Sequence, residues 1–116
     1  IGWNPNIKMI ENLHRGCRWW RPELTSEEDL NDIAAATQAV FEYCLNNLSA
    51  CAKKMTGSKF VALAGGSALN KRAVDNIRDD WVNVHVPHNP GDPGSCVGAV
   101  LARTKTKIEL KEQWNS

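Results

Sequence analysis

The sequence predicts a small α/β fold in which two short strands alternate with helices. A long stretch of helical periodicity, residues 25–57, is followed by the apolar run "KFVALAGG" at residues 59–66. The segment "WVNVHVP" at residues 81–87 alternates apolar and polar residues, as a second strand does. We expect a helix over residues 67–80 between the strands and another after the loop "HNPGDPG". A strand, a helix and a strand in this order predict parallel strands joined by a right-handed crossover.

Composition limits the classes of protein to which the chain can belong. With 116 residues, 42% hydrophobic and 23% charged, it is long enough for one folded domain with a modest core. A formal net charge of +1 gives no reason to expect nucleic acid or an anionic membrane as a partner. No run of about twenty apolar residues suits a membrane span. The first ten residues also lack the basic-then-apolar pattern of a signal peptide, and we expect a cytoplasmic location.

The absence of an initiating methionine suggests a processed product or a piece of a longer chain. The four cysteines, Cys17, Cys44, Cys51 and Cys96, form no CxxC pair and no metal-ligand spacing. Cys44 and Cys51 lie two helical turns apart on an apolar stripe, so we expect small buried hydrophobic side chains in a reducing compartment. A disulfide framework is the alternative.

Residues 1–24 show no clear period and predict an irregular segment rich in tryptophan and arginine. The cluster "HRGCRWWR" at residues 14–21 places arginines beside Trp19 and Trp20, an arrangement that can clasp phosphates and stack bases. The basic run is short and the rest of the chain is neutral. We therefore expect that the tryptophans, Trp3 included, pack on the domain with the arginines at the rim.

The long helix has clear start and stop signals. Thr25 and Glu28 fit a capping box, and the acidic residues 27–29 suit the positive end of the helix dipole. Gly57 ends the helix behind Lys53 and Lys54. Apolar and small residues recur at three and four along one stripe, which we expect to be buried: Leu30, Ile33, Thr37, Val40, Phe41, Cys44, Leu48, Cys51 and Met55.

The first strand runs into the loop "AGGSALN" at residues 64–70. Gly65 and Gly66 stand where the backbone must pass close to a ligand or to the next element. If a helix starts near Ser67, its free N–H groups point back to these glycines and attract anions. Asn70, one turn later, would reach a ribose or a phosphate. A tight turn without a ligand is the alternative, because the loop is neither GxGxxG nor a Walker loop.

The second loop, "PGDPGSCVGA" at residues 90–99, repeats this arrangement. Gly91 and Gly94 flank Asp92, and Ser95 opens the next helix. Asp92 is either a helix N-cap or a carboxylate that holds a divalent metal beside phosphates. Two such loops in one βαβα run predict a nucleotide cleft in which the N–H groups of two helix starts converge on a shared anion.

Two stretches of this chain resemble a known family. They are "IAAATQAVFEYCLNNLSACAKKMTGSKFVALAGGSALN" and "VHVPHNPGDPGSCVGAVLA", within residues 30–102. They are similar to O-carbamoyltransferases of the nodulation and antibiotic-tailoring type, whose ATPase-like domain belongs with actin and the sugar kinases. The resemblance implies that residues 25–116 are the C-terminal lobe of that domain. It further implies a partial ribonuclease-H-like fold, with a parallel βαβ unit flanked by helices and a sheet completed by a partner or by missing segments.

The resemblance also implies chemistry. ATP and carbamoyl phosphate would form a carbamoyl-adenylate, whose carbamoyl group passes to an acceptor hydroxyl. By position, Gly65, Gly66 and Asn70 would contact the nucleotide, and Gly91 and Gly94 would shape the second loop. Asp92 would hold a divalent metal (Fe, Mn or Mg).

The chain departs from the family in having neither the N-terminal lobe nor the second catalytic domain, and its histidines form no HxxxH pair. We therefore expect the isolated chain to be inactive, with the remaining lobe of the enzyme or a second copy as its partner. The alternative is an inactive interaction or oligomerisation module of the same fold.

Overall fold

The structure is a computed structural model, and it describes residues 16–109. The chain divides into two compact units, residues 1–51 and residues 52–116, which we describe separately. Trp3 and His14 lie outside the described residues. Within residues 16–109, no helix is both long enough and apolar enough to cross a membrane.

The first unit contains α1 (Cys17–Trp20) and most of α2 (Glu27–Thr56). The helical turn α1 lies within the segment expected to be irregular. Trp19 and Trp20 are 54% and 39% exposed, so the expectation that these two rings pack on the domain is wrong. The guanidinium of Arg21 lies 5.3 Å from the centre of the Trp20 ring and 3.4 Å from the Glu23 carboxylate.

The N-terminus of α2 is capped one residue later than the sequence predicted. The Ser26 Oγ accepts a hydrogen bond from the Asp29 N–H at 3.0 Å and donates one to the Asp29 carboxylate at 2.6 Å. Ser26 and Asp29, and not Thr25 and Glu28, therefore satisfy the first turn. Two hydroxyl residues stand side by side here, and their sequence pattern does not distinguish between them. The predicted end is confirmed, because Gly57 follows α2 with φ +63°.

The predicted stripe of α2 is largely exposed. Val40 is 63% exposed and Leu48 is 48% exposed, and Cys44 is also exposed. Cys51 is half-buried, so the expectation that both cysteines are buried is wrong. A neighbouring face of the helix is covered instead, at residues 38, 42, 45 and 49, and within the predicted stripe Ile33 and Phe41 are half-buried. Periodicity marks an apolar face, but it does not show that the described chain covers that face.

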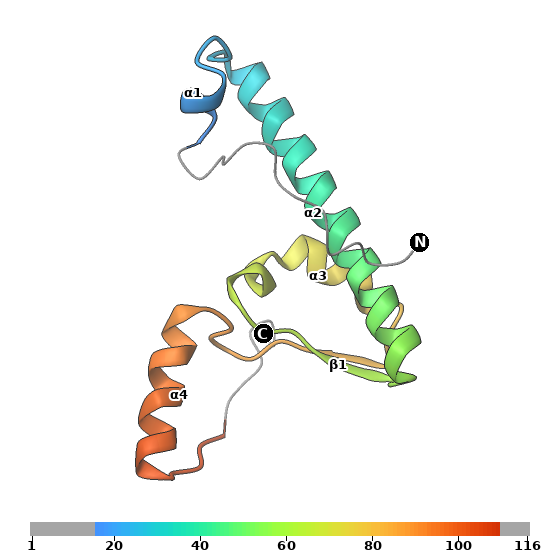
Figure 1. The fold of residues 1–116 in the computed structure, drawn as a ribbon, viewed down its shortest axis with the longest axis vertical. Helices are drawn as coiled ribbons and strands as arrows, with labels where there is room; N and C mark the ends of the chain where they lie inside the picture. Colours follow the sequence, from blue (N-terminus) through green and yellow to red (C-terminus); the bar gives the residue numbers. More distant parts are fainter. Residues whose placement is uncertain (1–15, 110–116) are drawn as a thin grey trace. The chain divides into compact units, whose positions relative to one another are not determined.

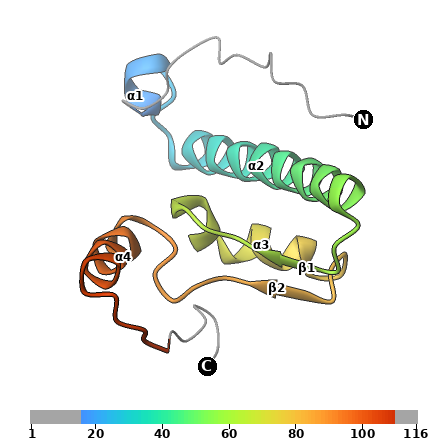
Figure 2. The same cartoon turned by 60° about the horizontal axis from the view of Figure 1, so that its bottom comes forward.

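The second unit is built on the predicted parallel pair. β1 (Phe60–Ala62) and β2 (Asn83–His85) form a two-stranded parallel sheet in which Val61 pairs with Val84 (Figures 1 and 2). This confirms a partial α/β fold with an open sheet. A parallel sheet is normally covered on both faces. Here Val84 and Val86 are buried, whereas Phe60 is 63% exposed.

A short 3₁₀ turn, η2 (Gly66–Leu69), precedes α3 (Lys71–Arg78). The single helix predicted over residues 67–80 is therefore wrong in its first turn. Asn70 separates the two segments, and its Oδ1 accepts a hydrogen bond from the Ala73 N–H at 3.2 Å. The apolar face of α3 forms most of the core, together with Trp81 and the β2 valines: the fully buried residues of α3 are Ala73, Val74 and Ile77. Figure 2 shows α3 lying against the two strands.

The last turn of α2 contacts the segment before β2. The Nζ of Lys53 lies 5.7 Å from the centre of the Trp81 ring and donates a hydrogen bond to the backbone oxygen of Asp80. The ring of Trp81 is buried, so this ammonium group lies on a nonpolar surface that the core already supports.

Candidate functional site

The two glycine loops of the second unit lie side by side. The Leu63 N–H donates to the carbonyl of His85 at 2.9 Å, which extends the pairing beyond β1. The Gly65 N–H then donates to the carbonyl of Pro90 at 2.6 Å. A Cβ atom built on Gly91 would lie 3.6 Å from the Cα of Gly66. The carboxyl ends of the two parallel strands therefore deliver both loops to one edge of the sheet.

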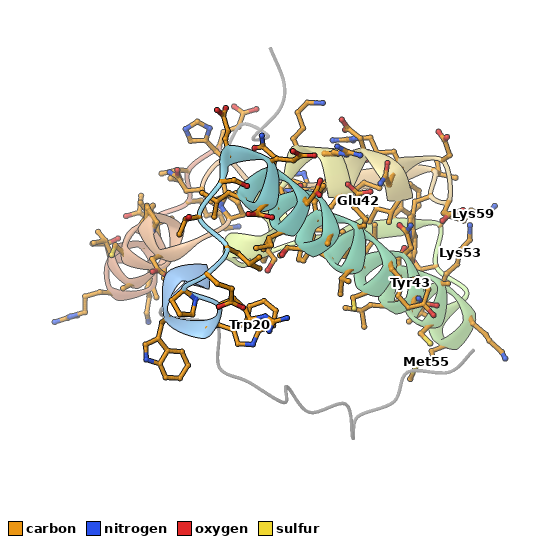
Figure 3. The ribbon with its side chains drawn as sticks, turned by 90° about the horizontal axis from the view of Figure 1, so that it is seen from above. Trp20, Glu42, Tyr43, Lys53, Met55 and Lys59 are labelled. Carbon is orange, nitrogen blue, oxygen red and sulfur yellow. The ribbon has the colours of Figure 1, made fainter. Side chains whose placement is uncertain are left out.

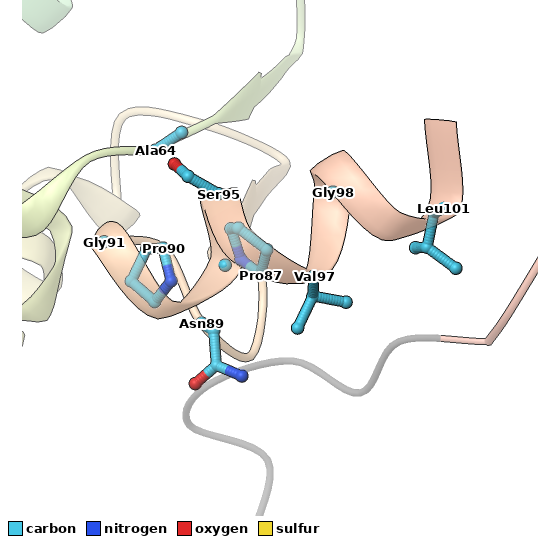
Figure 4. Close-up of a pocket in the computed structure, with 10 residues that line it drawn as sticks. Ala64, Pro87, Asn89, Pro90, Gly91, Ser95, Val97, Gly98 and Leu101 are labelled. Carbon is cyan, nitrogen blue, oxygen red and sulfur yellow. The ribbon is translucent and has the colours of Figure 1, made fainter. Parts of the chain in front are cut away.

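A cavity of about 280 Å³ opens beside the second loop (Figure 4). Pro87 and Pro90 form part of its wall, and Val97 and Leu101 face it from α4 (Asp92–Thr104). Asn89 and Ser95 supply polar side chains. The remaining lining residues are Ala64, Gly91, Gly94 and Gly98. The wall is mostly apolar with a few polar groups, which is the usual character of a small-molecule pocket.

Two of the six residues expected at the site, Gly91 and Gly94, line this cavity. Gly65 and Gly66 belong to the adjoining loop and are not in its wall. The same is true of Asn70 and Asp92. The cavity is formed mainly by the second loop and the first turns of α4, whereas the sequence interpretation divided the site equally between the two loops.

The positions of the two loops and of α4 that carry glycine differ in why a side chain is disfavoured there. Gly65 has φ +93° and ψ 163°, a region that side chains rarely adopt. A Cβ on Gly94 would lie 1.8 Å from the carbonyl oxygen of Asn89, so close backbone packing requires glycine there. Gly66 and Gly98 differ, because a Cβ on either meets no atom within 4 Å. Nothing in the described chain fills the space beside them.

Asn70 has a structural role. Its side-chain oxygen caps α3 through the Ala73 N–H, and the residue is half-buried. The expected nucleotide contact of Asn70 remains a prediction, and it would have to use another atom of the side chain than this capping oxygen.

The start of α4 offers fewer donors than expected. The helix begins at Asp92 rather than Ser95, with Gly91 at the N-cap position, so the N-cap alternative for Asp92 is wrong. Pro93 has no N–H, and the Gly94 N–H already donates to the Gly91 carbonyl at 3.0 Å. The first glycine loop leads into η2, and α3 starts only after Asn70. Two helix starts were expected to converge on an anion. Only the start of α4 directly follows a glycine loop and lies at the edge of the sheet where the two loops meet.

Asp92 is exposed in the first turn of α4, where the helix dipole favours a negative charge. No group of three His, Cys, Asp or Glu side chains comes together between residues 16 and 109. A single carboxylate suits Mg²⁺ or Mn²⁺ that takes its other ligands from phosphates and water. It does not form an all-protein cage for iron.

Sequence reasoning missed the apolar wall of the cavity. Val97 and Leu101 are four residues apart and therefore share a face of α4, next to Gly94 and Gly98. That spacing is visible in the sequence, but the sequence analysis used it only to predict a helix after the loop "HNPGDPG". In the structure no residue of α4 is buried, and Val97 and Val100 are 38% and 61% exposed.

Comparison with known proteins assigns the chain to a family. A family model described as "Carbamoyltransferase N-terminus" matches residues 3–101, which is most of the chain. No curated protein and no solved structure matches it. The family expected from the two loop motifs is therefore confirmed: this chain belongs to the carbamoyltransferase family, in which it matches the N-terminal domain.

Proposed function

We propose that this chain supplies the nucleotide-binding loops of an ATP-dependent carbamoyltransferase. The family makes carbamoyl transfer the general activity. In the proposed reaction, ATP and carbamoyl phosphate form a carbamoyl-adenylate, and an acceptor hydroxyl then takes the carbamoyl group. The chain would be the C-terminal lobe of an ATPase-like domain of the actin and sugar-kinase type, in an enzyme resembling those of nodulation and antibiotic tailoring.

The observation that carries this proposal is the open space beside Gly98 in the wall of an apolar cavity. A nucleoside needs flat apolar walls and a few polar groups, which Pro87, Val97 and Asn89 provide. The volume of about 280 Å³ is close to the lower end for small-molecule pockets, about 300 Å³, and suits a nucleoside better than a whole nucleotide. The phosphates would then extend past the cavity toward Gly66 and Asp92.

Asp92 is the carboxylate that would hold the divalent cation. Bound there, the cation would neutralise phosphate charge, and Asp92 would fix its position from the first turn of α4. Gly66 would allow the phosphate chain to pass close to the backbone, because no atom of the described chain lies within 4 Å of a Cβ built there. These are binding roles, and the transfer step itself would need groups from the rest of the enzyme.

One observation favours the alternative of an interaction module. Phe60, the first residue of β1, and Val82, just before β2, are 63% and 72% exposed, so this end of the sheet presents apolar side chains that the described chain does not cover. An inactive module would bind a partner there and ignore nucleotide.

Calorimetric titration with ATP and Mg²⁺ tests the proposed function. We expect millimolar or tighter binding, weakened about tenfold or more by Gly98→Leu, which fills the cavity. Ala99→Leu is the matched control, since Ala99 is exposed on the same helix and does not line the cavity. Asp92→Asn should remove the benefit of Mg²⁺ while ATP binds alone as before. Equal binding by wild type and Gly98→Leu would contradict the proposal.

A further inference from the structure

Five residues of α2 form a mostly exposed stripe, which we call the Cys44 stripe: Thr37, Val40, Cys44, Leu48 and Cys51. Val40 and Leu48 are 63% and 48% exposed, Thr37 and Cys44 are exposed, and Cys51 is half-buried. The Thr37 hydroxyl donates to the carbonyl of Ile33 at 2.8 Å, so its polar atom is satisfied inside the helix. The stripe is therefore apolar in effect, and it is more exposed than the neighbouring positions Phe41 and Leu45, which are half-buried.

The spacing of the stripe is symmetric about Cys44. From Thr37 to Cys51 the steps are three, four, four and three residues. At 100° a residue, all five positions fall within about 40° of the direction of Cys44. If two copies of the helix run antiparallel about a twofold axis at Cys44, Val40 of one faces Leu48 of the other. Thr37 then faces Cys51, and Cys44 faces its own copy.

The charges of α2 favour the antiparallel arrangement. The helix begins with Glu27, Glu28 and Asp29 and ends with Lys53 and Lys54. In an antiparallel pair centred on Cys44, Lys53 and Lys54 lie about 10 Å along the axis from the acidic start of the other copy, whereas a parallel pair would bring like charges together. The helix dipoles also oppose each other in the antiparallel pair. Figure 3 shows Met55 and Lys53 pointing to different sides of α2.

We propose that the Cys44 stripe is a self-association surface, and that a second copy of this chain covers it as an antiparallel α2 pair centred on Cys44. This inference does not rest on the proposed nucleotide site, since no residue of the stripe lines the cavity. An exposed apolar face on a long helix is the kind of surface that pairs with a partner helix.

Crosslinking of a chain with a single cysteine tests whether the twofold axis of the pair lies at Cys44. In a chain carrying Cys17→Ser, Cys51→Ala and Cys96→Ser, only Cys44 remains, and a short bis-maleimide should link two copies through it. The matched control keeps Cys51 instead of Cys44. Two Cys51 residues would lie about 20 Å apart along the pair, at 1.5 Å of rise per residue, and should not be linked. Adding Thr37→Cys to that control should restore the link.

Sedimentation of the intact chain tests the association itself. We expect twice the monomer mass, and Val40→Lys should raise the dimer dissociation constant about tenfold or more. Ala39→Lys is the control, because Ala39 is exposed on the other side of α2. Far-ultraviolet circular dichroism would show that both variants keep their helix. A monomer at all concentrations, or equal linking through Cys44 and Cys51, would overturn the proposal. If the chain is a monomer, the Cys44 stripe would instead be covered by a further segment of a longer carbamoyltransferase chain.

Discussion

The backbone N–H of Gly65 donates a hydrogen bond to the carbonyl of Pro90 at 2.6 Å. This bond joins the loop after the first strand to the loop after the second, beyond the last pair of the sheet. It fixes the edge on which the cavity opens. The proposed function therefore depends on the backbone geometry of the glycine loops as much as on the side chains in the cavity wall.

We predict that Gly65→Ala destabilises the second unit, because Gly65 has φ +93° and ψ 163°. Such a conformation costs a side-chain-bearing residue about 2 kcal/mol. Gly66→Ala is the control, since a Cβ there meets nothing within 4 Å. Urea denaturation should show a loss of about 2 kcal/mol for the first variant and less than about 0.5 kcal/mol for the second. Equal losses would mean that the backbone at Gly65 is not held in this conformation.

The two glycines of α4 should respond in opposite ways to alanine. A Cβ on Gly94 would lie 1.8 Å from the Asn89 carbonyl oxygen, so Gly94→Ala must displace the loop. Gly98→Ala meets open space and should stabilise the helix by up to about 1 kcal/mol. Thermal unfolding would separate the two: Gly94→Ala lowers the midpoint and Gly98→Ala raises it or leaves it unchanged. A lower midpoint for Gly98→Ala would show that the space beside it is filled.

Substitutions at Asn70 can separate its capping role from the predicted nucleotide contact. Asn70→Asp keeps an oxygen for the Ala73 N–H, so the stability should change little. Asn70→Ala should cost about 1 kcal/mol through loss of the cap. If Asn70 also contacts ATP, Asn70→Asp should weaken nucleotide binding despite the intact fold, because it adds a negative charge. Unchanged ATP binding by Asn70→Asp would restrict this residue to the cap.

Asp75 should titrate below the ordinary range. The Lys71 side chain donates a hydrogen bond to Asp75 at 2.5 Å and, with the Arg78 bond at 3.1 Å, holds the pKa of this carboxyl below its usual value. A pKa lowered by folding means that this pair stabilises the fold above the unfolded pKa of Asp75. The contribution is lost as the pH falls through the lower folded pKa.

Nuclear magnetic resonance of the Asp75 carboxyl carbon measures this pKa directly. Lys71→Met should raise the midpoint, and Arg78→Met should raise it less, because the Lys71 bond is the largest cause of the shift. Asp75 is exposed at the surface, and salt should therefore weaken the effect. A midpoint that does not move in Lys71→Met would show that the pair does not form in solution.

Much of the second unit follows from its sequence. The two strands, their parallel pairing and the apolar face of α3 are set by local patterns: alternation, glycine at strand ends and spacing of three and four. The break at Asn70 was not predicted, because Asn70 can cap a helix as well as continue one. The exposure of Cys44 and Val40 was not predicted either. A hydrophobic pattern shows which face a helix can bury, and the covering segment decides whether it does.

The candidate site was predicted in part. The sequence predicts that the two glycine loops lie close together, because Gly65 and Gly91 follow parallel strands whose carboxyl ends meet at one edge of the sheet. The cavity wall depends on how α4 leaves the second loop, and hence on the start of that helix at Asp92 rather than Ser95. Three residues at 100° each amount to a net rotation of about 60°, which changes the face presented to the cavity.

Mapping of backbone amide shifts on addition of ATP with Mg²⁺ tests the central claim most directly. We expect the amides of residues 64–66, 89, 91, 92 and 94–98 to move together at millimolar nucleotide, while those of α3 beyond its first turn do not. If these loops stay unperturbed while amides elsewhere in the chain move, or if no amide moves, the nucleotide does not bind at the glycine loops and the account is contradicted.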